Sequence, residues 1–218
     1  MKLLTFDMTL NLCSIALKKD KKIDQIYQFS YKNNNKMIIC MIQKILFKNS
    51  ILIKEIDYIA FSKGPGSFTG IRIATSVAKG ISIGLKIPLI GISTLKILAE
   101  QAKRKTLKKN FIILMYANKK NIYWGQYLFK NEKWILIKKE LFISNKIALK
   151  KLKEIKKKWN IIQNVNFSFL NNYKKKKIFN ISNPFAIDII PLALQIIKNN
   201  KNLKKTIIPN YLNNKINN

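Results

Sequence analysis

Residues 62–86 read SKGPGSFTGIRIATSVAKGISIGLK, and this stretch decides how the rest of the chain is interpreted. The apolar residues at 56–61 come just before it and predict a buried strand, because isoleucine, tyrosine and phenylalanine favour strands. Glycine and proline at 64–66 end that strand. The residues that follow predict a helix over 70–85, so the stretch forms a strand, a glycine-rich turn and a helix.

The turn also has the features of an anion-binding site. Ser67 or Thr69 can cap the helix, since a short hydroxyl accepts a hydrogen bond from an unpaired amide at a helix start. Free amides and the helix dipole favour negative charge there, so Gly64, Gly66 and these two residues are candidates for a phosphate site. The turn is not a Walker loop, because no Gly-Lys-Ser/Thr follows it. A purely structural turn is the alternative.

The helix predicted over 70–85 is unusually poor in bulky side chains. One row of small residues recurs every four positions, and a second row lies beside it: Gly70, Ala74, Ala78 and Ser82, then Ser76, Gly80 and Gly84. A glycine inside a helix costs about 1 kcal/mol relative to alanine, so we expect close packing to offset the loss. Two surfaces can supply that packing, namely the chain's own sheet and a helix of a partner subunit.

The composition is dominated by lysine. The formal net charge of the 218 residues is +32, and a field of that size attracts nucleic acid or any acidic surface. Arg72 and Arg104 are nevertheless the only arginines, and asparagine and isoleucine are inflated alongside lysine. Because these three residues share A/T-rich codons, we attribute most of the charge to mutational drift. A protein selected to read nucleic acid would use more arginine, whose planar fork pairs with phosphates and base edges.

Several classes of chemistry are excluded or disfavoured by what the chain lacks. It has no histidine, which excludes Ser-His-Asp, Cys-His and His-ligated metal sites within this chain. The chain has only ten acidic residues, whereas a magnesium or calcium site needs several oxygen ligands, so we expect neither a metal site nor a cofactor. Cys13 and Cys40 are expected to be reduced core residues of a cytoplasmic protein. We expect no signal peptide, and polar residues and prolines argue against a membrane span at 178–197.

The predicted elements fall into two halves that both begin with strands. The first half is expected to contain strands at 3–6, 13–17, 26–31, 56–61 and 87–92 and helices at 36–48, 70–85 and 94–103. The second is expected to contain strands at 111–117, 122–129, 133–138 and 161–170, helices at 145–159 and 187–198, and a short segment at 207–212. A basic stretch around 104–110 separates them, so we expect one lobe over 1–105 and another over 106–218. The repeated β-rich start indicates an internal duplication.

Asp7 ends the first expected strand and has two interpretations. In actin-like phosphotransfer folds an aspartate at this place lies beside nucleotide phosphates and metal. A lone carboxylate after a strand is also typical of a turn cap.

With these residues in view, the chain resembles the bacterial TsaB family, also called YeaZ, of threonylcarbamoyladenosine biosynthesis proteins. The resemblance rests on motifs that occur in the family's order along the whole chain: Asp7 with CSIAL at 13–17, GPGSFTGIR at 64–72, AKG at 78–80, GISTL at 91–95, YW at 123–124 and PNYL at 209–212. The glycine-rich run at 64–72 is the most specific of these, because it is shared mainly with this family and its catalytic relatives.

The resemblance implies a two-lobed α/β fold of the actin/Hsp70/sugar-kinase (ASKHA) type, in which each lobe is a mixed sheet flanked by helices. It implies a non-catalytic subunit that binds the catalytic subunit TsaD and, with the ATPase TsaE, supports transfer of threonylcarbamoyl to the adenosine next to the anticodon of ANN-reading tRNAs. Pairing in the family uses first-lobe helices, which correspond here to these candidates: Met37, Met41, Ile45, Gly70, Arg72, Ala74 and Ala78. Arg72 can pair with a partner carboxylate or cap its own lobe. An apolar face left uncovered is also compatible with a homodimer when the partner is absent.

The chain departs from the family pattern at residues that could touch a ligand. It has Met8 after Asp7, Asn34 in place of histidine, Cys40 in place of proline, and YANKKN at 116–121 in place of an acidic and basic run. Loss of charged residues beside a retained glycine-rich turn favours a scaffold. Two alternatives stay open.

The first alternative is an ATP- and magnesium-dependent enzyme of the same fold, with Asp7 at the metal and residues 64–69 as the phosphate cradle. The second is a tRNA-binding module that uses the lysines at 150–158 and 174–177. These runs lack the interleaved aromatics and arginines that base recognition uses.

Overall fold

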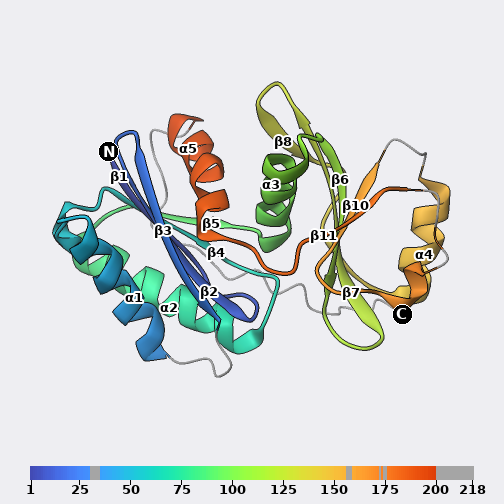
Figure 1. The fold of residues 1–218 in the computed structure, drawn as a ribbon, viewed down its shortest axis with the longest axis horizontal. Helices are drawn as coiled ribbons and strands as arrows, with labels where there is room; N and C mark the ends of the chain where they lie inside the picture. The colour runs from blue at the N-terminus through green and yellow to red at the C-terminus, as the bar shows by residue number, and fades with distance from the viewer. Residues whose placement is uncertain (30–34, 156–158, 172, 174–175, 200–218) are drawn as a thin grey trace. The chain divides into compact units, whose positions relative to one another are not determined.

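The computed structural model describes residues 1–29, 35–155, 159–171, 173 and 176–199 (Figure 1). Asn34, the lysines at 156–158 and 174–175, and the expected segment at 207–212 with its PNYL motif lie outside the described residues. The described part forms two compact units, one of residues 1–97 and 184–199 and the other of residues 98–183. Among the described helices, none is both long enough and apolar enough to cross a membrane.

The first unit is built on a five-stranded mixed sheet. Its strands are β1 (Lys2–Asp7), β2 (Leu12–Lys19), β3 (Lys22–Phe29), β4 (Tyr58–Ser62) and β5 (Leu89–Ile92). They lie in the order β3-β2-β1-β4-β5. The β1-β2-β3 meander is antiparallel, whereas β4 and β5 add to the sheet in parallel. The parallel strands need crossovers, and helices supply them.

Two helices cover one face of this sheet, and a third covers the other (Figure 1). Helices α1 (Asn35–Lys48) and α2 (Phe68–Leu85) form a core with alternate strand residues, among them Leu4 and Phe6. Thr5 lies between these two residues and therefore points to the opposite face. There its hydroxyl donates a 2.8 Å hydrogen bond to the Ala186 carbonyl.

The C-terminal helix α5 (Ile189–Asn199) belongs to the first unit. The 3₁₀ turn η3 (Ala186–Asp188) leads into it and is bonded to the sheet from two strands. Besides the bond from Thr5, the Ala186 amide donates to the Ser14 hydroxyl at 2.9 Å. The chain division therefore differs from the expected one in two respects. Residues 184–199 return to the first unit, and the boundary falls after Ile97, inside α3 (Thr94–Thr106).

The second unit contains a six-stranded sheet and its own core. Its strands are β6 (Asn110–Tyr116), β7 (Asn121–Lys130), β8 (Lys133–Leu136), β9 (Leu141–Ser144), β10 (Asn160–Gln163) and β11 (Ile178–Asn180). The order is β11-β10-β6-β7-β8, and β9 also pairs with β7. Helix α4 (Asn145–Glu154) packs Ala148 and Leu152 into the core with residues of β6, β7 and β10. In the part of α3 that belongs to this unit, the Glu100 carboxylate accepts a 2.6 Å hydrogen bond from the Trp134 indole.

The two sheets share one topology. Reading β8-β7-β6-β10-β11 beside β3-β2-β1-β4-β5 shows the same antiparallel meander followed by two parallel additions. The internal duplication indicated by the sequence is therefore present in the strand order. The predicted fold class, two lobes that are each a mixed sheet flanked by helices, is confirmed.

The largest difference from the predicted elements lies at residues 161–170. The expected single strand is only β10 there, which ends at Gln163. The Gln163 side chain accepts a 3.4 Å hydrogen bond from the Phe167 amide, and a 3₁₀ turn, η2 (Ser168–Leu170), follows. Helix α4 also ends at Glu154, earlier than expected, and the short strands β9 and β11 were not predicted.

Candidate functional site

The glycine-rich turn packs against the turn between β1 and β2. Ser67 caps α2 as predicted, with its hydroxyl accepting a 3.4 Å bond from the Gly70 amide. The Ser67 amide donates to the Thr9 carbonyl at 2.7 Å. A Cβ added at Gly66 would lie 2.4 Å from the Thr9 oxygen, and one at Gly70 would lie 1.9 Å from the Met8 oxygen. These two glycines therefore let one backbone approach the other.

Asp7 lies beside this contact, fully buried, and its carboxylate is held by the turn. It accepts a 3.2 Å bond from the Thr9 amide and a 2.8 Å bond from the Thr9 hydroxyl. Burial raises the pKa of Asp7 to about 6, although the nearby Ser62 hydroxyl and the bonds from Thr9 oppose the shift. This geometry is that of a turn cap, the second of the two interpretations.

The predicted phosphate cradle is assembled but partly occupied by the chain itself. Asp7, Gly64, Gly66 and Ser67 meet at the carboxyl ends of β1 and β4, while Thr69 is exposed in the first turn of α2. The Ser67 amide, which would face an anion, already bonds to a carbonyl. No group of three or more potential metal-ligating side chains occurs in the described part of the chain. Phosphate binding by these residues stays a prediction.

The two rows of small residues on α2 have different surroundings. Gly70, Ala74, Ala78 and Ser82 are buried against the chain's own sheet and core, which is the first of the two alternatives. The second row is exposed: Ser76, Gly80 and Gly84. A Cβ added at Gly80 or Gly84 would meet nothing within 4 Å. Only the second row is therefore open to a partner.

The predicted partner contacts on α1 need the same correction. Met41 and Ile45 are 7% and 0% exposed, and both lie in the core of the first unit together with partly buried Met37. These apolar residues face the sheet because the sheet is the largest apolar surface available to the helix. Arg72 is exposed, with its guanidinium 3.6 Å from the centroid of the Phe68 ring.

A different set of residues forms the outward surface of the two helices, which we call the helical face. Its members are Ile39, Gln43 and Phe47 on α1, and Ser76, Gly80, Ile83 and Gly84 on α2. Phe47 and Ile83 are 90% and 75% exposed, and with Ile39 they place several apolar side chains on one face. A groove of about 390 Å³ runs between the helices, lined by Ile39, Ile42, Gln43, Leu46, Ile53, Val77, Gly80 and Ile81. The spacing of Ile39, Gln43 and Phe47 is the sequence signal for this face, since four-residue steps share one side of a helix.

The two cysteines also differ from each other. Cys13 is buried as predicted, and burial raises the pKa of its thiol to about 12, so the thiol stays protonated. Cys40 is exposed on α1, and its prediction as a core residue is wrong because position 40 falls on the side of the helix turned away from the sheet.

Comparison with known sequences places the chain among tRNA-modification proteins. The family model described as TsaD, tRNA N6-adenosine threonylcarbamoyltransferase, matches residues 28–212. A relative from Buchnera aphidicola subsp. Acyrthosiphon pisum is 39% identical over 97% of both chains and is called tRNA threonylcarbamoyladenosine biosynthesis protein TsaB. The Escherichia coli protein of the same name is 26% identical, over 99% of this chain and 96% of its own.

Solved structures agree with the fold. YeaZ from Pseudomonas aeruginosa superposes with a TM-score of 0.77 at 23% identity, covering 91% of this chain and 94% of its own. At 23% identity the structural likeness shows the fold alone. The match to the Buchnera aphidicola protein, at 39% identity over 97% of both chains, shows the family. The chain therefore belongs to the TsaB family of tRNA threonylcarbamoyladenosine biosynthesis proteins.

Proposed function

We propose that this chain is a non-catalytic partner subunit that binds the catalytic TsaD subunit through the helical face and stabilises its active form. The observation that carries the proposal is the pair of exposed apolar side chains, Phe47 and Ile83, on the two helices that form an apolar groove lined in part by Gly80. Exposed apolar surface next to a groove is typical of a protein interface. Glycine at position 80 leaves room for a partner helix to approach closely.

A non-catalytic role is supported by the chemistry that the chain contains. It has no histidine to act as a base or a metal ligand. The buried carboxylate of Asp7 is bonded by Thr9 and is not presented to solvent. The transfer of threonylcarbamoyl to tRNA is therefore assigned to the partner.

TsaD is the proposed partner because the family model of the transferase matches this chain over most of its length. Two chains of related fold carry related helix pairs, and such pairs can pack face to face in one interface. In this proposal the ATPase TsaE and the tRNA join through TsaD, and the complex acts in the cytoplasm. When TsaD is absent, the same face is available for a homodimer.

The test is binding of the full chain to TsaD of the same organism, measured by calorimetry. Wild type is expected to form a 1:1 complex, and Gly80→Glu and Ile83→Glu are expected to weaken it at least about thirtyfold, the loss typical of an interface hot spot. Both sites are exposed, so both variants are expected to fold. Ala74→Glu is unsuitable, because Ala74 is buried in the core.

The matched control is Ile135→Glu, which places the same charge on an isoleucine of β8 that is 44% exposed. It is expected to bind TsaD like wild type. Equal binding by all three variants would rule out the helical face as the interface. If wild type ignored TsaD but bound ATP with Mg²⁺, the enzyme alternative would replace the scaffold.

A further inference from the structure

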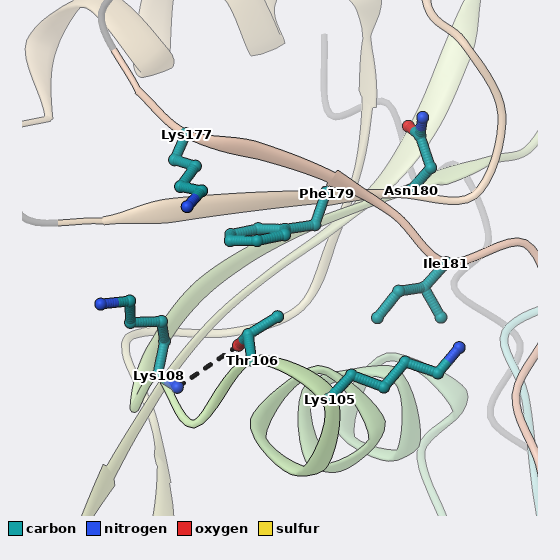
Figure 2. Close-up of a pocket in the computed structure, with 7 residues that line it drawn as sticks. All are labelled: Lys105, Thr106, Lys108, Lys177, Phe179, Asn180 and Ile181. Carbon is teal, nitrogen blue, oxygen red and sulfur yellow. Dashed lines mark hydrogen bonds between the residues drawn. The ribbon is translucent and has the colours of Figure 1, made fainter.

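A second pocket, of about 410 Å³, is lined entirely by residues of the second unit (Figure 2). The end of α3 and the edge strand β11 line it, and its residues are Lys105, Thr106, Lys108, Lys177, Phe179, Asn180 and Ile181. Residues more than 65 positions apart in the sequence therefore meet around one hollow. A volume of this size accommodates a small organic ligand.

The lining carries three ammonium groups and no carboxylate. Lys105, Lys108 and Lys177 are all exposed, and none of them is in a salt bridge with a carboxylate among the described residues. The C-terminus of α3 contributes partial negative charge here, which the lysines outweigh. An anion is therefore the favoured occupant.

An aromatic ring lies beside the lysines of this pocket. Phe179 is half-buried in β11, and Figure 2 shows its ring between Lys177 on one side and Thr106 on the other. The Lys177 ammonium is 5.2 Å from the ring centroid. The Thr106 hydroxyl donates to the Ala102 carbonyl at 2.7 Å and accepts from the Lys108 amide at 3.3 Å, which fixes this wall.

We propose that this pocket binds a nucleotide, with the phosphate among the three lysines and the base against the Phe179 ring. Stacking on an aromatic ring beside cationic side chains is the usual way in which proteins hold unpaired nucleotides. Single-stranded RNA and free nucleotides both carry this chemistry. The proposal does not depend on pairing with TsaD, because every lining residue lies in the second unit.

The first experiment measures binding of a fluorescein-labelled ten-nucleotide single-stranded RNA to the full chain by anisotropy, over a series of salt concentrations. The triple variant Lys105→Ala, Lys108→Ala, Lys177→Ala is expected to bind at least about tenfold more weakly. Its slope of log K against log salt is expected to be smaller by about 0.7, because the three lysines surround one phosphate and each neutralised phosphate contributes about 0.7 for a single strand.

The matched control removes the same charge from exposed lysines elsewhere in the second unit, through Lys119→Ala, Lys120→Ala and Lys133→Ala. If the slope falls equally in both triple variants, the RNA is held by the overall charge and the pocket is not a site. Thermal unfolding of both variants verifies that they fold.

The second experiment isolates the aromatic contact. Phe179→Leu keeps an apolar side chain and removes the ring. It is therefore expected to weaken RNA binding about tenfold and to leave the binding of inorganic polyphosphate unchanged. Equal affinity of wild type and Phe179→Leu for the RNA would overturn the proposal. Competition by AMP distinguishes the two ligands. If micromolar AMP displaces the labelled RNA, the pocket binds a free nucleotide. If only unlabelled RNA displaces it, the pocket binds an RNA strand.

Discussion

Replacing Gly70 by alanine is expected to destabilise the protein by about 3 kcal/mol or more. The added Cβ would lie 1.9 Å from the Met8 carbonyl oxygen, a backbone atom that cannot turn away as a flexible side chain would. The Ser67 amide is bonded to Thr9, so α2 cannot move away from the β1-β2 turn without breaking that bond. Urea unfolding followed by circular dichroism measures the change in the free energy of unfolding.

The control is the same substitution in the same helix at Gly80. An alanine Cβ there meets nothing within 4 Å, so the variant gains helix propensity without a clash. Gly80→Ala is expected to stabilise the protein by up to about 1 kcal/mol. Two similar values for Gly70→Ala and Gly80→Ala would contradict the close contact between α2 and Met8.

Replacing Asp7 by asparagine is expected to stabilise the protein at pH 7 by about 3 kcal/mol. Burial raises the pKa of Asp7 in the folded state to about 6 from an ordinary value of 3.8, and each pKa unit corresponds to about 1.4 kcal/mol. At pH 7 the wild-type carboxylate is ionised, and burying this charge lowers the free energy of unfolding. Asparagine has no charge to bury and keeps an oxygen that accepts from the Thr9 amide.

The sign of the pH dependence follows from the same shift. Because the folded state binds the Asp7 proton more tightly than the unfolded state, the contribution of Asp7 to stability rises as the pH falls from about 6 towards 4. The difference between Asp7→Asn and wild type is therefore expected to be largest at pH 7 and to vanish near pH 4. Urea unfolding at four pH values measures it, with Asp57→Asn as a control at an exposed carboxylate. A difference that is constant with pH would show that Asp7 has an ordinary pKa.

Local signals predicted much of the first unit. The hydroxyl of Ser67, the glycine-rich turn and the apolar spacing of α1 each act over a few residues, and each formed as expected. Short-range hydrogen bonds and periodicity determine such features with little help from the rest of the fold. The same holds for the β1-β2-β3 meander.

Features that depend on distant partners were missed. The sequence shows that α2 carries two rows of small residues, but only the position of the sheet decides that Ala74 is buried and Gly80 exposed. In the return of α5 to the first unit, Ala186 accepts a hydrogen bond from Thr5 and donates one to Ser14, across more than 170 residues.

The nucleotide pocket was missed for the same reason. Lys105 and Phe179 become neighbours only when β11 joins the edge of the second sheet, and that strand is too short for its pattern to be recognised.

The shared strand order of the two sheets has a consequence for how many partners one chain can hold. In the first unit, the crossover between β4 and β5 is the helix α2, which contributes half of the helical face. Between the matching strands β10 and β11, the described residues form only the 3₁₀ turn Ser168–Leu170. A duplicated chain with two helical faces would be divalent and would link partners into open arrays. In the proposed assembly, a chain whose described part carries one such face would hold a single partner there.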